Sequence, residues 1–262
     1  MQQRIITGLV FGGIVLLLLS IGYIGSVVLL TVITLGASYE YTQITKPPKL
    51  LQFLSVALAL GTFIFLSFGA FDEKTLFYIA LFSVIIHILA IQSLYISFDF
   101  HKFIPAIVIL LFGLPLGVMA KFIALHPESS TILLYTILLV WICDSTAYFV
   151  GSKFGKHKLM MKISPGKTWE GFFGAGVGAI VFAVVCHLYN NNYPLVFCIA
   201  MSVIVWIFGA YGDLFESSIK RKFGVKDSGN FMPGHGGFYD RFDAFIFVLP
   251  FIVLLHFIYF NL

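Results

Sequence analysis

Charged residues are scarce in this chain of 262 residues: Asp, Glu, Lys and Arg together make up 11% of it, whereas a typical soluble domain has roughly 25%. This scarcity excludes a soluble globular fold. Cysteine is scarce as well. The three cysteines, Cys143, Cys186 and Cys198, lie in apolar runs without CxxC or Cys/His spacing. We therefore expect buried thiols, and neither a disulfide nor a zinc site.

Hydrophobic side chains dominate instead, at 60% of the sequence, with a mean hydropathy of +1.00. A helix needs about 20 apolar residues to cross a bilayer. We predict an all-α, polytopic transmembrane bundle of about nine helices, near residues 5–20, 23–44, 52–70, 76–97, 103–124, 131–151, 171–190, 194–212 and 243–261. The first run resembles a signal peptide, with Arg4 ahead of an apolar core. No small-x-small cleavage site precedes the next run, so we expect it to be retained.

The 16 cations divide unequally between the two sides of such a bundle. With nine helices, the loops on one side contain 14 Lys and Arg residues, and those on the other contain two, Lys74 and Lys121. Cytoplasmic loops are rich in Lys and Arg. The bias predicts a cytoplasmic N-terminus in the cell (inner or plasma) membrane. It also places in the cytoplasm the two loops that are richest in Lys and Arg, near residues 153–167 and 220–241. The net charge of +4 then reflects topology and affinity for anionic lipids, with no nucleic acid as partner.

Polar residues divide the chain into two parts. Residues 1–124 carry almost no polar signal within their apolar runs. We expect these helices to form a scaffold that faces lipid or, in a homodimer, a second copy of the chain. Residues 125–262 contain the dense polar clusters, so we expect them to form a catalytic region whose site faces the cytoplasm.

The densest cluster lies between Asp213 and Asp243, where five acids and five cations stand among five glycines. Asp213, Glu216 and Lys220 recur at helical spacing, directly after an apolar run. Asp213 should therefore lie at the cytoplasmic end of a membrane helix that stops near Gly224. The glycines allow the chain to turn back. Such a cluster suits a divalent metal with a phosphate chain, because Mg²⁺ prefers hard oxygen ligands while Lys and Arg neutralise phosphate oxygens.

A second polar stretch lies between Asp144 and Gly171. Asp144 stands within an apolar helix, where an acid costs roughly 2.5–3.5 kcal/mol on insertion scales, so it should face a partner or a water-filled cavity. Gly151 follows on the same helical face and permits close approach of another helix. Lys167 stands beside hydroxyls in a turn just before a helix, which favours phosphate binding. Its Gly-Lys-Thr triplet is no Walker A loop, because Met161 occupies the position of the required glycine.

Both stretches resemble signature motifs of the phosphatidate cytidylyltransferases, the CDP-diacylglycerol synthases. The C-terminal motif is carried by Ser217, Lys220, Arg221, Lys226, Asp227, Pro233, His235, Gly236, Gly237, Asp240 and Arg241. The mid-chain motif is carried by Asp144, Ser145, Thr146, Ala147, Tyr148, Ser164, Pro165, Lys167, Thr168, Glu170 and Gly171. The motifs stand in the family's order, and the length and helix count of the chain fit it.

The resemblance implies an enzyme that transfers the cytidylyl group of CTP to phosphatidic acid, giving CDP-diacylglycerol and pyrophosphate, with Mg²⁺ and room for a second metal ion. We expect the metal ligands to be Asp213 and Asp240, with Asp144 as a third carboxylate. We expect catalytic roles for Asp144, Lys167, Lys220, Arg221, Lys226, Asp227 and Arg241. We expect the substrates to be bound by Ser164, Lys167, Thr168, Ser217, Lys220, Arg221, His235, Gly236, Gly237 and Arg241.

The sequence leaves open the roles of Asp243 and His235, and it allows two other functions. Asp243 either joins the site or serves as N-cap of the last helix, and His235 either orients a phosphate or caps the turn. A CTP-dependent polyprenol or phytol kinase faces the same electrostatic problem in a similar membrane setting. An anion or nucleotide transporter would also gather cations and intramembrane acids, but transport predicts polar residues through the full membrane depth and symmetry between halves. Charge gathered at one face fits membrane-bound catalysis better.

Overall fold

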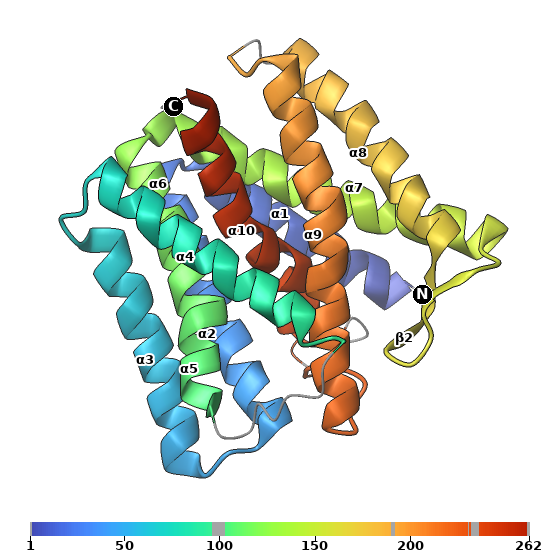
Figure 1. Ribbon diagram of the computed structural model, residues 1–262, viewed down its shortest axis with the longest axis horizontal. Coiled ribbons are helices and arrows are strands. Elements are labelled where there is room, and N and C mark those ends of the chain that lie inside the picture. The colour runs from blue at the N-terminus through green and yellow to red at the C-terminus, as the bar shows by residue number, and fades with distance from the viewer. Residues whose placement is uncertain (1, 96–102, 190–191, 230, 232–235, 261–262) are drawn as a thin grey trace.

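The computed structural model describes residues 2–95, 103–189, 192–229, 231 and 236–260, with side chains from residue 7 onward. Within these ranges the chain folds into helices and one small hairpin (Figure 1). The α-helices are α1 (Gln2–Ser20), α2 (Tyr23–Thr45), α3 (Lys49–Phe68), α4 (Glu73–Gln92), α5 (Ile104–Val108), α6 (Leu114–Leu125), α7 (Ser130–Phe154), α8 (Trp169–Tyr189), α9 (Leu195–Lys222) and α10 (Tyr239–Phe260). A π-helical turn, Ile109–Gly113, joins α5 to α6, and a 3-10 turn, Pro127–Ser129, precedes α7.

The helices confirm the predicted architecture. Among the described residues, eight segments are long and apolar enough to cross a membrane. One of them, Ile104–Leu125, is formed by α5, the π-helical turn and α6 together. Thr7–Ser20, within α1, is a shorter apolar helix. The chain is thus an all-α, integral membrane protein, and its helices lie close to the apolar runs of the sequence.

Local sequence explains where helices end. α2 ends at Thr45, and the next residue, Lys46, adopts a left-handed conformation ahead of Pro47 and Pro48. Proline lacks the N–H that would continue the helix. α9 continues through Asp213, and the chain then turns at Gly224, whose φ of +70° lies in the region that glycine tolerates. The predicted membrane helix that carries Asp213 and stops near Gly224 is confirmed.

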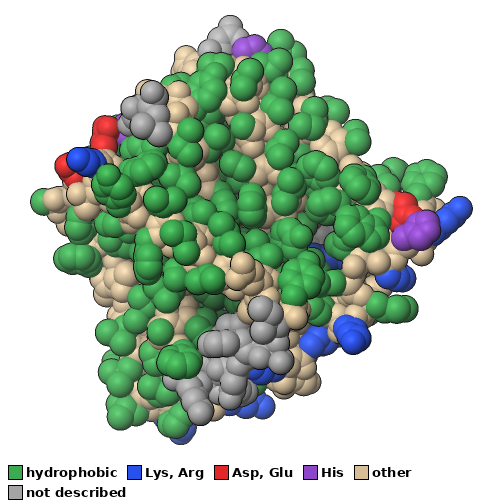
Figure 2. All heavy atoms as spheres, viewed as in Figure 1, with side chains coloured by type: hydrophobic (Ala, Val, Ile, Leu, Met, Phe, Trp, Pro, Cys, Tyr) green, Lys and Arg blue, Asp and Glu red, His purple; other side chains and the backbone are tan. Residues whose placement is uncertain are grey.

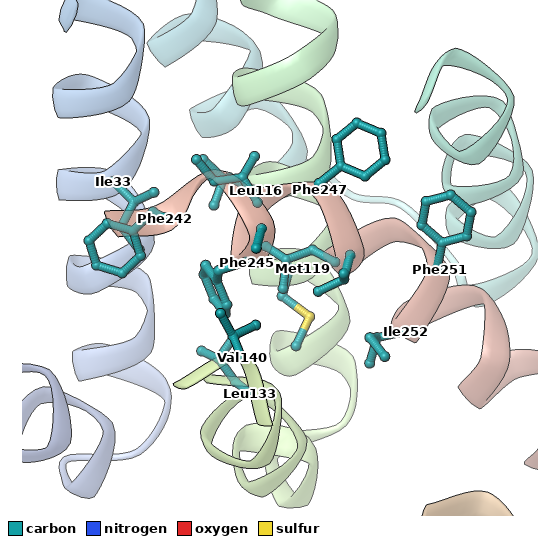
Figure 3. Packing of buried hydrophobic residues seen from close by; sticks show 14 of the residues in the cluster. Ile33, Leu116, Met119, Leu133, Val140, Phe242, Phe245, Phe247, Phe251 and Ile252 are labelled. Atoms are coloured by element: carbon teal, nitrogen blue, oxygen red, sulfur yellow. The ribbon is translucent and has the colours of Figure 1, made fainter. Parts of the chain in front are cut away.

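α10 lies at the centre of the bundle. It packs against α9 and also against α2, α4 and α6. Figure 3 shows Phe242 on the side of α10 that faces Ile33 of α2, and Phe245 pointing toward Val140 of α7; all four side chains belong to one buried cluster. The polar first turn of α10 is therefore held in place by an extensive apolar core, which includes helices from the first part of the chain.

A small antiparallel hairpin within the described chain was not predicted. β1 (Lys158–Met160) pairs with β2 (Ser164–Thr168). The Glu170 carboxylate, at the start of α8, accepts a hydrogen bond from the His157 backbone N–H at 3.2 Å, and its Oε1 lies 2.6 Å from His157 Nδ1. This contact ties the hairpin to α8. Lys167 lies just before α8, as predicted, but it belongs to a strand and not to a turn.

α7 and α8 approach each other through glycine. A side chain added at Gly171 of α8 would meet the carbonyl oxygen of Ala147 in α7. One added at Gly151 of α7 would lie 3.5 Å from the Cα of Gly171. The prediction that Gly151 permits close approach of another helix is confirmed. This contact brings the polar ends of α7, β2 and α8 together.

The predicted sidedness can be tested at exposed lysines. Lys158 and Lys222 belong to the cytoplasmic group of cations and Lys74 to the opposite group, and all three are exposed. We expect Lys158→Cys and Lys222→Cys to react with an impermeant maleimide in inside-out vesicles, and Lys74→Cys to react in intact cells. The unsubstituted protein, whose three cysteines are buried, gives the background. Labelling of the first two variants from opposite sides would contradict the predicted topology.

Candidate active site

The two polar stretches of the sequence meet around one cavity of about 620 Å³, between α7, β2, α8, α9 and α10. Figure 2 shows basic side chains gathered along the edge of the molecule near β2 and the end of α9, beside a largely hydrophobic face. The predicted site residues that line the cavity are Asp144, Ser164, Lys167, Thr168, Asp213, Lys220, Asp227, Asp240 and Arg241. Residues far apart in the sequence thus share one space.

Three carboxylates meet in the cavity wall. Asp213 and Glu216 come from α9, and Asp243 comes from α10; one oxygen of each lies within 4.8 Å of the other two. Glu216 is buried, and its Oε1 has no hydrogen-bond partner among the described residues. Carboxylates at this spacing repel one another unless a cation lies between them. The triad therefore suits a hard divalent cation, for which carboxylate oxygens are preferred ligands.

Lys220 stands between two acids. Its Nζ lies 2.5 Å from Glu216 Oε2 and 2.6 Å from Asp240 Oδ1. The other oxygen of Asp240, Oδ2, accepts hydrogen bonds from the backbone N–H groups of Ser228 at 3.0 Å and Gly237 at 2.7 Å. Both oxygens of Asp240 are thus engaged in joining α9, the following loop and α10. The expected metal-ligand role of Asp240 and phosphate-binding role of Lys220 stay predictions.

Lys167 connects the two sequence motifs. Its Nζ, on β2, lies 2.7 Å from Asp213 Oδ2, on α9, and both side chains remain partly accessible, at 25% and 34%. Ser217 donates a hydrogen bond from Oγ to Asp213 Oδ1 at 3.2 Å. Asp144 on α7 is exposed and lines the same cavity. The prediction that Asp144 faces a cavity is confirmed.

Two further predicted residues hold neighbouring elements of the site in place. Arg221 is exposed and donates hydrogen bonds to two backbone carbonyls, from Nε to Ile163 at 3.3 Å and from a terminal nitrogen to Val225 at 3.2 Å. It therefore links the hairpin to the end of α9. Thr168 is buried, and its Oγ1 accepts a hydrogen bond from the Gly171 N–H at 3.2 Å. That bond satisfies a backbone donor in the first turn of α8.

The glycine-rich loop holds the remaining predicted residues. Lys226 is exposed. Gly236 has a φ of +86°, and a side chain there would approach Asp240 Oδ2. Glycine is therefore favoured at this position by both conformation and space. His235 lies outside the described residues.

Two acids of the triad had no firm role in the sequence analysis. Glu216 was noted only for its spacing from Asp213, and Asp243 was left open between site residue and N-cap. α10 begins at Tyr239, so Asp243 lies inside the helix and the N-cap alternative is wrong. The available signal was helical spacing, because Asp240 and Asp243 are separated by three positions, as are Asp213 and Glu216.

Comparison with known proteins shows the family of the chain. The model of the family described as "Cytidylyltransferase family" matches residues 2–259. The chain belongs to the cytidylyltransferase family. It is 35% identical to a protein of Bacillus subtilis (strain 168) described as phosphatidate cytidylyltransferase, over 97% of both chains. Relatives with the same description from Staphylococcus haemolyticus (strain JCSC1435) and Staphylococcus aureus (strain COL) are 44% and 47% identical, over 51% and 47% of this chain and 52% and 48% of theirs.

The charge around the cavity shows what this cytidylyltransferase needs in order to hold a nucleotide. Three cations line the cavity, namely Lys167, Lys220 and Arg241, against six acids, namely Asp144, Asp213, Glu216, Asp227, Asp240 and Asp243. A triphosphate is itself a polyanion, so the protein side chains alone would repel it at short range. A bound divalent cation would reduce this excess of three negative charges to one, and it would attract the acids and the phosphates together.

The buried position of Lys220 leads to a stability prediction. Removing one partner of a buried ion pair costs about 3–5 kcal/mol, because the other charge is left uncompensated. Lys220→Met would leave Glu216 and Asp240 without their shared cation. We expect its thermal unfolding midpoint in detergent to fall well below that of the unsubstituted protein. Lys162→Met removes an exposed lysine outside the cavity lining and should leave the midpoint unchanged; equal midpoints for the two variants would contradict a supporting role for Lys220.

Proposed function

We propose that the chain transfers the cytidylyl group of CTP to phosphatidate at the cytoplasmic face of the plasma membrane, giving CDP-diacylglycerol and pyrophosphate. Similarity over nearly the full length to a phosphatidate cytidylyltransferase supports the choice of acceptor. The observation that carries the proposal is the cavity, where an acidic triad lies beside Lys167 and Arg241 within an otherwise apolar bundle. There a water-soluble nucleotide and a membrane lipid can meet.

The reaction needs positioning more than proton transfer. An oxygen of the phosphatidate phosphate bonds to the α-phosphorus of CTP, while the bond from that phosphorus to the bridging β-phosphate oxygen breaks and pyrophosphate leaves. A phosphate monoester has a second pKa of about 6, so the attacking oxygen is already ionised at neutral pH. No general base is required, and the described cavity lining contains no histidine. Catalysis then consists of alignment and charge neutralisation.

Asp213, Glu216 and Asp243 fit a divalent cation, and we propose Mg²⁺. Their oxygens are hard ligands within 4.8 Å of one another, and Glu216 Oε1 has no other described partner. When bound, the ion would neutralise charge on the triphosphate and on the leaving pyrophosphate. Asp144 lines the same cavity and is available for a second ion, whereas Asp240 would have to give up its contact with Lys220 or with the loop in order to join it.

Lys167 and Arg241 are the cations best placed for phosphate. Lys167 is partly accessible and is paired with Asp213. Because Asp213 would also bind the divalent ion, the Lys167 ammonium would be left with donors for a phosphate oxygen. Arg241 is exposed at the cavity, and its planar guanidinium can bind two phosphate oxygens at once. Lys220 is enclosed by two acids and supports them. A catalytic role is proposed for Asp227, which lines the cavity. The other contacts proposed for CTP or lipid phosphate are those of Ser164, Thr168, Ser217, Arg221, Lys226, His235, Gly236 and Gly237.

The position of the radiolabel in the product distinguishes this reaction from that of a lipid kinase. Purified protein is incubated with phosphatidate or a polyprenol and with CTP labelled at either the α- or the γ-phosphate. We expect α-label to enter the lipid in the presence of phosphatidate and Mg²⁺, with γ-label released as pyrophosphate. Transfer of γ-label to polyprenol would establish a kinase instead. Nucleotide uptake into sealed vesicles without lipid labelling would indicate transport.

The acidic triad predicts which carboxylates the activity requires. Asp213→Asn and Asp243→Asn keep the size of the side chain but remove charge that a hard cation needs. We expect each to lower turnover at least a hundredfold, a loss of about 2.7 kcal/mol in transition-state stabilisation. We also expect Mg²⁺ to raise the thermal unfolding midpoint of the unsubstituted protein but not that of either variant. Lys153→Gln, an exposed change that leaves the triad intact, serves as control. Near-normal Mg²⁺-dependent turnover in both Asn variants would contradict the metal assignment.

A further inference from the structure

One acid of the N-terminal helices reaches the loop and helix end that form the site. Glu40 lies on α2 and is 6% exposed. Its Oε2 accepts hydrogen bonds from the Ser228 hydroxyl at 2.6 Å and the Tyr239 N–H at 2.8 Å, and its Oε1 accepts one from the Phe238 N–H at 2.8 Å. All three partners are donors, so an ionised carboxylate satisfies them without rearrangement.

Two of these donors belong to the start of α10. The first N–H groups of a helix have no partner within the helix, and the helix dipole favours a negative charge near them. Glu40 supplies both the acceptors and the charge from another helix. The turn that it holds leads directly into Asp240, Arg241 and Asp243, which line the cavity. A displacement of this helix end would therefore move three side chains of the site together.

Ser228 extends the contact toward the ion-paired acids. Its hydroxyl donates to Glu40, its Oγ accepts from the Asp240 N–H at 3.3 Å, and its own N–H donates to Asp240 Oδ2 at 3.0 Å. Asp240 in turn pairs with Lys220, which pairs with Glu216 of the triad. One chain of polar contacts thus runs from α2 to the acidic triad.

The loop lies in close contact with Glu40 and with α2. A side chain added at Gly229 would meet the Glu40 carboxylate. One added at Gly237 would meet both the Ser228 hydroxyl and Glu40 Oε2. On the α2 side, one added at Gly36 would meet the ring of Phe238. Small residues on both elements therefore let the loop lie directly on the carboxylate.

We propose that Glu40 is a positioning residue for cytidylyl transfer, which sets the first turn of α10 and, through Ser228 and Asp240, the acidic triad. This inference rests on the proposed function, because its kinetic test measures cytidylyl transfer. Glu40 does not line the described cavity, so it acts through other residues and not on the substrates. The region expected to be scaffold would thereby supply one fixed point of the site.

The test compares Glu40→Gln with Ser38→Ala. Glutamine has the shape of glutamate, but its NH₂ group would face a donor. Ser38 is buried on the same helix, and its hydroxyl has no hydrogen-bond partner among the described residues. We expect Glu40→Gln to lower kcat at least tenfold and to raise the Mg²⁺ concentration for half-maximal activity at least fivefold, while Ser38→Ala changes neither. A purely structural role would reduce the active fraction and leave the Mg²⁺ requirement of the remaining molecules unchanged, and that result would overturn the proposal.

A Ser228→Ala variant provides a second test, which does not require the Glu40→Gln variant to fold. We expect Ser228→Ala to shift the Mg²⁺ requirement in the same direction, and Glu40→Gln with Ser228→Ala to lose less activity than the product of the two single losses. Fully multiplicative losses would contradict the route through Ser228. If Glu40→Gln does not accumulate as folded protein, an unchanged Mg²⁺ requirement in Ser228→Ala overturns the proposal.

Trypsin supplies a readout that needs no turnover. Lys226 is exposed in the loop that leads to Ser228. We expect cleavage after Lys226 to be at least threefold faster in Glu40→Gln than in the unsubstituted protein or Ser38→Ala, because the loop has lost its anchor. Equal cleavage rates would argue against the anchor. If the unsubstituted protein forms no CDP-diacylglycerol, the proposed function fails, whereas the cleavage comparison still decides whether Glu40 holds the loop.

Discussion

A carboxylate enclosed in an apolar bundle needs a partner, because an unpaired buried charge is costly. Around the cavity this requirement joins the helices to one another. Lys220 ties α9 to α10 through Glu216 and Asp240, and Lys167 ties β2 to α9 through Asp213. The acids exceed the cations, so pairing remains incomplete. The remaining negative charge suits a divalent cation, and the ion pairs that join the helices also shape the cavity.

α10 combines two physical roles within one helix. Its first turn carries the polar side chains of the site, and the residues that follow are apolar and largely buried among α2, α4, α6 and α9. The extensive packing fixes the direction of the helix axis. The hydrogen bonds of Glu40 fix its N-terminal end. Together they place Asp243 opposite Asp213 and Glu216 with little freedom, which a metal site with a defined ligand spacing requires.

Both parts of the chain contribute to the site, but they differ in how many polar residues they supply. All described residues that line the cavity come from α7 and later elements, in the part where the sequence concentrates its charge. α2 contributes one carboxylate, placed behind the cavity wall. A lone acid within an apolar run is costly in a membrane, and Glu40 was such a signal. It was overlooked because charged clusters, rather than single residues, guided the sequence analysis.

The sequence by itself determined the all-α transmembrane class, the approximate span positions and the family motifs, since hydrophobic length and local spacing depend only on neighbours along the chain. It also located the polar ends of α7 and α9 and the break near Gly224. Only the tertiary structure decided which acids meet. Asp240 turned toward Lys220 and the loop, while Glu216 and Asp243 joined Asp213, because the rotation of α9 and α10 about their axes depends on packing across the bundle. The contact of Glu40 with Ser228 was equally undetermined, since nothing local relates residues so far apart in the chain.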